Sequence, residues 1–369
     1  MTVIIKVDPL NPEPWGVRFG ARIIAGGGLV AFPTETVYGL GANALDGSAA
    51  RRVFNAKGRP VDNPLIVHVS SFDGLRSVAE PPPWLLEPLR KFWPGPLTVV
   101  LPRKKVVPDE VTAGLDTVAV RMPAHPVALR LIDESRVPIA APSANTSTKP
   151  SPTRAEHVVE DLWGKVDLVL DGGETFFGVE STILKVEDSR VTVIRPGPYT
   201  PEELSKLFPK LEVSIYARGV AADRPIAPGM KYKHYAPTKP LFMAADQSVL
   251  VQLSRELSMR GVNHVVLCSR ETSAYIGAPT IVLGGRGDLY EVAKNLFHAL
   301  RVFDRRTEPL GLVEPFNESG VGLAVMNRLR KACGGTVVKD ADQVLREGGI
   351  SGSTHPLSGS KARHQEIRA

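Results

Sequence analysis

The chain has 369 residues, and because single hydrophobic cores stop growing at roughly 250 to 300 residues, we expect two domains. Hydrophobic residues make up 43% and charged residues 23%, a composition that excludes a chain disordered along its whole length. The net charge of +6 fits an anionic small substrate as well as RNA, so charge does not choose between these partners.

Short β-like segments separated by glycine and proline fill the chain up to about residue 208. We predict strands at Leu29–Pro33, Leu65–Val69, Leu97–Leu101, Val118–Met122, Ile139–Pro142, Val166–Leu170, Thr182–Val186 and Val191–Arg195. Helical patterns at Pro14–Ala25 and Ala49–Ala56 predict helices on at least one face of the sheet. The irregular order of these elements indicates a mixed α/β domain with a twisted sheet over residues 1–212.

Residues 213–240 have the composition of a linker. Gly219–Pro240 contains four prolines and no apolar periodicity. Met230–Tyr235 nevertheless holds two tyrosines and two lysines, so we expect this segment to lie against the rest of the protein.

Beyond the linker, strands and helices alternate regularly. We predict strands at Leu241–Ala244, His264–Cys268, Thr280–Leu283 and Leu310–Val313, and helices at Gln247–Met259, Asp288–Asp304 and Gly320–Ala332. This pattern predicts a small Rossmann-like α/β domain over residues 241–347. Because no G-x-G-x-x-G motif follows its first strand, we expect no dinucleotide site there. Residues 348–369 are rich in glycine, serine and histidine and are expected to be disordered.

The sequence predicts neither a membrane segment nor a cysteine-based site. Its apolar stretches are far shorter than the about 20 residues of a membrane helix, and its N-terminus has no long apolar signal segment, so we expect a cytoplasmic location. Cys268 and Cys333 stand alone, which predicts buried thiols rather than a zinc site or a disulfide.

Polar segments after the predicted strands are the candidates for chemistry. Pro33–Ala44 combines hydroxyls with glycines, so its backbone could approach a ligand closely, although an ordinary polar turn is an equal alternative. The chain has no P-loop, H-E-x-x-H or G-x-S-x-G motif. An enzyme that uses ATP would therefore need another kind of phosphate-binding site.

Two pairs of residues, each two apart, could hold a polyphosphate. Lys57 and Arg59 precede Pro60, and in an extended segment both cations would point to one side and bind one anion. Ser143 and Asn145 follow a predicted strand and would add a hydroxyl and an amide at the same edge. Taken alone, the first pair is as readily explained as a solvated basic turn. Ser and Asn after a strand are more often turn residues than ligands.

Some predicted strands carry polar residues opposite their apolar faces. His68 lies opposite the aliphatic residues of its strand, and Thr117 and Arg121 share a face of theirs. A guanidinium in an apolar strand needs an anionic partner, which could be a substrate carboxylate or a structural Asp or Glu. Taken alone, His68 is better explained as a satisfied core histidine than as a ligand-binding residue. Ser181 and Arg195, beside the last two strands, are ambiguous individually.

Together, and in this order, these segments resemble the threonylcarbamoyl-AMP synthase family with the YrdC-type fold, in its long form with a C-terminal extension. The resemblance covers nearly the whole chain and rests on PTETVYGLG, KGRPVDNPLIVH, WPGPLT, TVAVRMPAHP, APSAN, GVEST, IRPG and, in the linker, PGMKYKHYAP. It implies a concave basic cavity covered by the linker. It also implies conversion of L-threonine, bicarbonate or CO2, and ATP to L-threonylcarbamoyladenylate and diphosphate, for N6-threonylcarbamoyladenosine in tRNAs reading ANN codons.

The resemblance implies roles for individual residues, with catalysis assigned to Lys57 and Arg59. The implied ATP-binding positions are Lys57, Arg59, Thr117, Ser143, Asn145, Ser151, Arg195 and one of Tyr232 and Tyr235. The implied threonine-binding positions are Thr34, His68, Arg121, Ala141 and Ser181. Mg2+ is expected on the ATP phosphates without protein side-chain ligands. Transfer to tRNA would belong to partner proteins, with at most a weak RNA contact of this chain.

Two alternatives to the synthase remain. An RNA-binding module fits the basic charge but lacks an RNP-type aromatic signature and a long Lys/Arg stripe. Carbamoyl transfer from carbamoyl phosphate would be a role of the kind seen in hydrogenase-maturation relatives, which join the fold to different domains.

In the synthase reaction, a carbamate of threonine attacks the α-phosphate of ATP, so the enzyme needs positioning and charge stabilisation but no covalent nucleophile.

Overall fold

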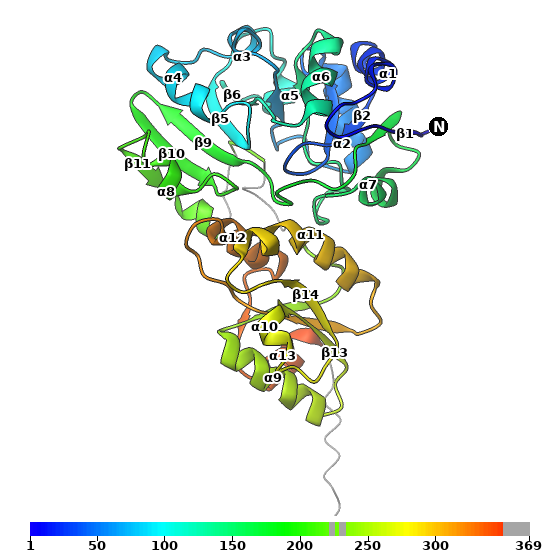
Figure 1. Ribbon diagram of the computed structural model, residues 1–369, viewed down its shortest axis with the longest axis vertical. Helices are drawn as coiled ribbons and strands as arrows, with labels where there is room; N and C mark the ends of the chain where they lie inside the picture. Colours follow the sequence, from blue (N-terminus) through cyan, green and yellow to red (C-terminus); the bar gives the residue numbers. More distant parts are fainter. Residues whose placement is uncertain (221–225, 229–233, 350–369) are drawn as a thin grey trace, which may run out of the picture.

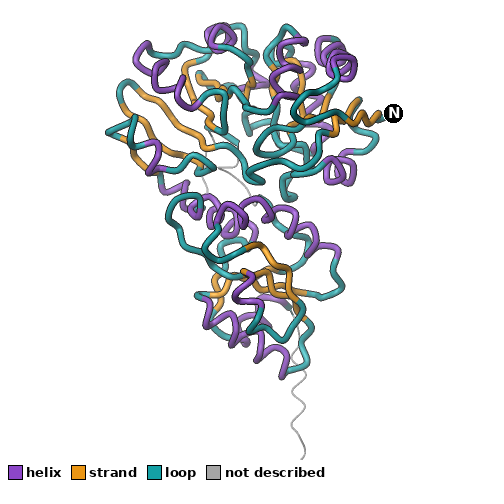
Figure 2. Tube along the Cα trace, viewed as in Figure 1, coloured by secondary structure: helices purple, strands orange, loops and turns teal. Residues whose placement is uncertain are grey.

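The computed structural model describes residues 1–220, 226–228 and 234–349. Their strands form an 11-stranded mixed sheet that ends at Val213 and a separate 5-stranded sheet that begins at Leu241. Figure 1 shows the two α/β domains one above the other, and Figure 2 shows helices packed around the strands of both. The tail predicted to be disordered lies outside the described residues, apart from Gly348 and Gly349. Within the described ranges, no helix has the length and apolar character needed to cross a bilayer.

The first sheet contains every strand predicted for it and three more. Its strands are β1 (Val3–Lys6), β2 (Val30–Phe32), β3 (Gly39–Asn43), β4 (Ile66–His68), β5 (Leu97–Pro102), β6 (Thr117–Arg121), β7 (Ile139–Ala140), β8 (Leu168–Asp171), β9 (Thr182–Glu187), β10 (Arg190–Arg195) and β11 (Leu211–Val213), in the order β1-β8-β2-β3-β7-β4-β6-β5-β9-β10-β11. The prediction missed β1, β3 and β11. In β3 the glycines Gly39 and Gly41 conceal the strand, because glycine is a poor strand former. A Cβ at Gly41 would lie 2.8 Å from Phe32, so the close packing requires glycine there.

Helices flank this sheet and position part of the cavity described below. They are α1 (Pro14–Ala25), α2 (Gly47–Lys57), α3 (Phe72–Val78), α4 (Pro83–Phe92), α5 (Asp109–Thr112), α6 (Pro126–Ser135), α7 (Ala155–Leu162), α8 (Pro201–Leu204) and the 3-10 turn η1 (Ile215–Arg218). Helix α2 begins after Asp46, whose carboxylate accepts hydrogen bonds from two backbone amides, and ends before Gly58 in the left-handed conformation. Lys57 is therefore the last helical residue, and the extended conformation predicted for it is wrong.

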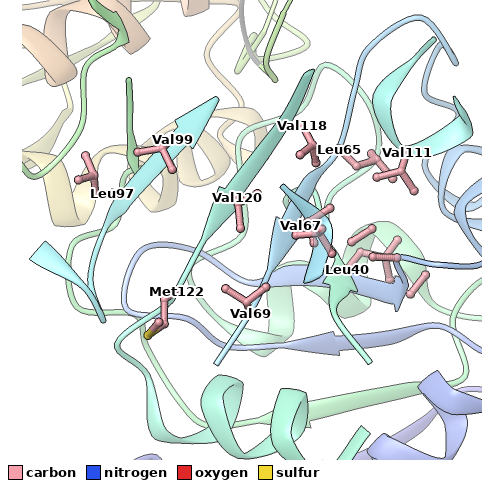
Figure 3. Packing of buried hydrophobic residues seen from close by; sticks show 14 of the residues in the cluster. Leu40, Leu65, Val67, Val69, Leu97, Val99, Val111, Val118, Val120 and Met122 are labelled. Carbon is pink, nitrogen blue, oxygen red and sulfur yellow. The ribbon is translucent and has the colours of Figure 1, made fainter. Parts of the chain in front are cut away.

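The main hydrophobic core lies on one face of the first sheet. Leu65, Val67 and Val69 are buried there beside Val120 of β6 (Figure 3). Because successive strand residues point to opposite faces, His68 projects to the other side, as predicted. The sheet therefore separates an apolar core from a polar cavity.

The second sheet is entirely parallel, and its strand pattern was largely predicted. Its strands are β12 (Leu241–Ala244), β13 (His264–Ser269), β14 (Thr280–Gly284), β15 (Leu310–Val313) and β16 (Val337–Val338), in the order β14-β13-β15-β12-β16. In the Rossmann order the first strand pairs with the second. Here β15 lies between β12 and β13, so the domain shares the parallel α/β architecture but has a different strand order.

Helices cover both faces of the second sheet. They are α9 (Gln247–Met259), α10 (Arg270–Ser273), α11 (Leu289–Arg305), α12 (Gly322–Ala332) and α13 (Ala341–Gly348). Helices α9 and α13 pack on one face, and α11 and α12 pack on the other, which is turned toward the first domain (Figure 1). Cys268 and Cys333 are buried thiols, as predicted.

The two domains share a hydrophobic cluster. Val37 and Val179 of the first domain lie in the same cluster as the buried faces of α11 and α12. Tyr235, at the described end of the linker, packs on Phe297 of α11 with ring centroids 4.9 Å apart. The expectation that this segment lies against the protein is confirmed at Tyr235. The start of the predicted linker differs, because η1 buries Ala217 in the core of the first domain.

Candidate functional site

A cavity lies where the central strands of the first sheet meet the end of the linker. Its described lining comes from the loops after β2 and β7, the end of α2, strands β4 and β6, the segment before β9, the end of β10 and the linker. The lining residues are Thr34, Thr36, Val37, Gly39, Lys57, Arg59, Ile66, His68, Arg121, Ala141, Pro142, Ser143, Asn145, Ser147, Thr148, Ser151, Glu180, Ser181, Arg195, Pro228, His234 and Tyr235.

Most of the residues singled out from the sequence meet in this cavity. Those that line it are Thr34, Lys57, Arg59, His68, Arg121, Ala141, Ser143, Asn145, Ser151, Ser181, Arg195 and Tyr235. Thr117 lies outside the lining. It begins β6 opposite Pro102, four residues before Arg121, and at about 3.3 Å per residue this places the two residues about 13 Å apart along the strand. Tyr232 lies outside the described residues.

Lys57 joins the two predicted pairs into one unit. Its Nζ donates hydrogen bonds to the backbone carbonyls of Ser143 and Asn145. The side chain is almost fully buried, with 1% of the residue exposed. Burial, followed by the positive charge of Arg59, holds the pKa of Lys57 well below its usual value. A bound anion would oppose both effects and favour the charged ammonium.

The loop after β7 is held by its own polar side chains. Ser143 Oγ donates to Asn145 Oδ1 at 2.6 Å. Asn145 Nδ2 donates to the carbonyls of Thr146 and Lys149 at 2.8 and 2.9 Å. The amide predicted to bind ligand therefore shapes the loop, whose carbonyls in turn anchor Lys57.

Two arginines add charge to the cavity from fixed positions. Arg59 donates to the carbonyls of Asn63 and Pro64 at 3.2 to 3.3 Å. Arg195, at the end of β10, donates to Ser181 Oγ at 3.0 Å and to the Ser181 carbonyl at 3.1 Å. These contacts fix the two guanidiniums at positions where both line the cavity.

Arg121 has a carboxylate partner within the protein. Its Nη2 lies 2.7 Å from Oε1 of Glu35, and both side chains are buried. Nη1 donates to Thr36 Oγ1 at 2.9 Å, and Thr36 in turn meets Thr34 Oγ1 at 2.8 Å. The structural salt bridge weighed as an alternative is thus present. It orients the guanidinium, which still lines the cavity.

His68 is expected to remain neutral between about pH 5 and 8. Its burial, followed by the charge of Arg121, lowers its pKa to about 3. An NMR titration of the ring resonances, assigned with a His68→Gln variant, should show no midpoint in that range, whereas the same histidine in urea should titrate near the usual histidine pKa of about 6.5. A folded-state midpoint near 6.5 would contradict the buried environment.

The sequence did not reveal the contribution of the second domain. Arg328 of α12 reaches Glu180 of the first domain, with Nη2 3.0 Å from Oε2. Glu180 lines the cavity and stands directly before Ser181 in GVEST. No local signal could have connected them, because the two residues are 148 positions apart.

Comparisons with known proteins assign both domains. Residues 22–197 match the Sua5/YciO/YrdC family model, described as "Telomere recombination", and residues 199–334 match the model described as "Threonylcarbamoyl-AMP synthase, C-terminal domain". The chain is 47% identical to the threonylcarbamoyl-AMP synthase of Pyrococcus abyssi, over 92% of this chain and 100% of that protein. It is 45% identical to the Bacillus subtilis enzyme of the same name, over 90% and 97%.

A solved structure agrees with this assignment. The crystal structure of P. abyssi Sua5 complexed with L-threonine matches with a TM-score of 0.85 and 46% identity, over 92% of this chain and 99% of that one. The match spans both domains, and the mixed α/β fold expected from the resemblance is confirmed. The chain belongs to the threonylcarbamoyl-AMP synthase family, whose members are nucleotidyltransferases that make L-threonylcarbamoyladenylate.

Proposed function

We propose that the cavity brings together ATP, L-threonine and bicarbonate or CO2, and that the protein releases L-threonylcarbamoyladenylate and diphosphate. The observation that carries the assignment of the nucleotide is the buried ammonium of Lys57, which links the K-x-R and S-x-N segments in one cavity. Arg59 and Arg195 line the same cavity. Three cations around one space suit a triphosphate.

The proposed reaction needs alignment and charge stabilisation. The amine of threonine captures CO2 as a carbamate and loses a proton. A carbamate oxygen then attacks the α-phosphorus, the bond to the β-phosphate oxygen breaks, and diphosphate leaves. Lys57 and Arg59 would stabilise the charge that develops on the phosphate oxygens, because fixed donors in a closed site need little reorganisation.

Mg2+ is proposed to accompany ATP. The carboxylate among the described lining residues is Glu180, and its two oxygens already accept from Ser151 and Arg328. This donor set fits an ion that takes its ligands from phosphate oxygens and water, as Mg2+ commonly does. The ion would neutralise phosphate charge beside the cations of the cavity.

The carboxylate of threonine is proposed to bind Arg121, with Thr34, His68, Ala141 and Ser181 around the substrate. The hydrogen bonds of Arg121 to Thr36 and the Gly95 carbonyl use two of its five N–H groups, and its Nη2 forms the ion pair with Glu35. The others suit a second carboxylate. The side chain of Glu35 would then hold the guanidinium of Arg121 in position for the carboxylate of threonine.

Replacing Arg121 with lysine is expected to raise the KM for threonine roughly 10- to 100-fold, because a charged hydrogen bond contributes about 1.5 to 3 kcal/mol. Lysine keeps a charge for Glu35 but cannot form the fork. The KM for ATP should change much less. Steady-state assays with each substrate varied in turn measure both values, and Arg76→Lys, at an exposed surface position, is the matched control. A common rise in both KM values would argue against this placement of threonine.

The activity itself is tested by incubating the protein with ATP, labelled bicarbonate and each amino acid in turn, and identifying adenylates by mass spectrometry. We expect a threonylcarbamoyl adenylate and stoichiometric diphosphate. If carbamoyl phosphate alone sustained turnover, the carbamoyl-transfer alternative would replace the proposal. Salt-sensitive tRNA binding without nucleotide turnover would favour the RNA-binding module.

The product is proposed to serve N6-threonylcarbamoyladenosine formation in tRNAs reading ANN codons, in the cytoplasm. Partner proteins would transfer the threonylcarbamoyl group, because an adenylate is an activated carboxyl donor that a second active site can use. Any RNA contact of this chain would be weak.

A further inference from the structure

Arg328 is a fully buried cation that the second domain places against the cavity of the first. It lies on α12 and has 0% exposure. Its Nε and Nη2 lie 3.1 and 3.0 Å from Glu180 Oε2, and its Nη1 donates to the Pro196 carbonyl. The neighbouring Asn327 donates to the carbonyl of Ala217 at 2.9 Å, so a second hydrogen bond beside this contact holds α12 against the first domain.

The other oxygen of Glu180 holds a residue of the cavity. Ser151 Oγ donates to Glu180 Oε1 at 2.6 Å, and Ser151 is 1% exposed. Burial alone would raise the pKa of Glu180, but Arg328 and then Arg195 outweigh it and lower the pKa to about 2. Glu180 is therefore an anion at neutral pH. A carboxylate anion only accepts hydrogen bonds, so the hydroxyl proton of Ser151 is directed at Glu180.

We propose that Arg328 is a positioning residue for the nucleotide subsite, and that it acts through Glu180 to fix Ser151 as a hydrogen-bond acceptor for the ligand. This inference rests on the proposed function. With its proton directed at Glu180, Ser151 presents lone pairs to the cavity. It therefore binds a donor group of the nucleotide, such as a ribose hydroxyl or the adenine amine, and does not donate to a phosphate oxygen. The second domain thereby sets the polarity of one contact in the first.

Because of this pair, the nucleotide subsite depends on the second domain. Without Arg328, a buried carboxylate would remain next to Ser151 with less positive charge around it, and a buried charge that loses its partner is strongly destabilised. Glu180 would then rotate or take up a proton. Either change frees Ser151 to turn its proton toward the ligand.

The test compares Arg328→Met with Arg330→Met, a substitution two residues away on the same helix. Arg330 pairs with Glu318 and donates to the Arg218 carbonyl, so its replacement perturbs α12 without touching Glu180. In adenylate formation, Arg328→Met is expected to raise the KM for ATP about tenfold or more and to leave the KM for threonine within about twofold. Arg330→Met, the control, should leave the KM for ATP and the KM for threonine unchanged.

A double-mutant cycle identifies the route of the effect. If Arg328 acts through Ser151, then Arg328→Met should add little to the KM for ATP in a Ser151→Ala background. Glu180→Gln should partly restore ATP binding to Arg328→Met, because the uncharged amide needs no cation and its carbonyl can still accept from Ser151. If Arg328→Met fails to fold, the same comparison of KM values applies to Arg328→Lys and to Glu180→Gln alone.

The outcomes separate this inference from the proposed function. Equal rises in both KM values, or full additivity with Ser151→Ala, would overturn the positioning role and leave the synthase activity standing. An unmutated protein that makes no threonine-dependent adenylate would overturn the proposed function. In that case, calorimetric titration with a non-hydrolysable ATP analogue still tests whether Arg328 and Ser151 act together on nucleotide affinity.

Discussion

Replacing Lys57 with alanine is expected to lower kcat/KM for adenylate formation by about 10²- to 10³-fold, the usual cost of removing one fixed charge-stabilising donor. Two features of the site support an effect of this size. The ammonium is nearly excluded from water, which strengthens its attraction for phosphate. It also anchors the carbonyls of Ser143 and Asn145, so its loss affects the loop opposite.

The measurement is steady-state turnover with diphosphate release as the readout, together with the melting temperature. Lys91→Ala, at an exposed position on α4, is the matched control and should behave like the unmutated protein. Lys57→Ala should retain threonine binding by calorimetry, because Arg121 lies on β6 and its partners Glu35 and Thr36 lie in the loop after β2. Unimpaired turnover by a well-folded Lys57→Ala protein would rule out its role at the phosphates.

Some features of the site were predictable because they depend on local periodicity. The alternation in Leu65–Val69 correctly placed His68 on the polar face, since neighbouring strand residues point to opposite sides. The spacing of Lys57 and Arg59 also indicated one shared cavity. The extended conformation predicted for this segment was wrong, because helix α2 ends before Gly58, which takes the left-handed conformation. A glycine directly after a helical pattern is a recognisable stop signal that could have corrected this.

Other features were not predictable because they depend on contacts between distant segments. Arg328 lies within the predicted helix Gly320–Ala332, and nothing beside it in the sequence indicates Glu180. The same holds for Arg301 of α11, which donates to Asp161 Oδ2 at 2.8 Å and to the Pro150 carbonyl at 2.7 Å. The interface thus contains two buried arginines, each matched to a carboxylate of the first domain.

The Arg301 contact supports the same cavity from a second side. Asp161 also accepts from the backbone amide of Thr146 and from Lys149 Nζ, at 3.2 and 3.1 Å. These residues belong to the loop whose carbonyls anchor Lys57 and which leads to Ser151. The second domain therefore holds both ends of that loop, one through Asp161 and the other through Glu180.

A chain that ends at Pro240 is accordingly expected to lose adenylate formation by 100-fold or more, because each broken buried pair costs about 3 to 5 kcal/mol and both act on the cavity. Truncation also exposes the apolar residues Val37 and Val179 and removes Phe297, on which Tyr235 packs. A chain that ends at Gly349 retains every described contact and serves as the control. Turnover, melting temperature and ATP affinity are compared among the full-length protein, the chain that ends at Pro240 and the chain that ends at Gly349.

A second truncated protein separates stability from positioning. Adding Glu180→Gln and Asp161→Asn to the chain that ends at Pro240 removes the two buried carboxylates that have lost their arginine partners, so its melting temperature should recover toward that of the control. Its turnover should stay low, because neither amide restores the contacts that α11 and α12 make with the loop after β7 and with Glu180. Full activity in the chain that ends at Pro240, with or without the two substitutions, would mean that the first domain and linker maintain the cavity unaided. Low activity with recovered stability would instead assign the second domain a direct part in arranging the site.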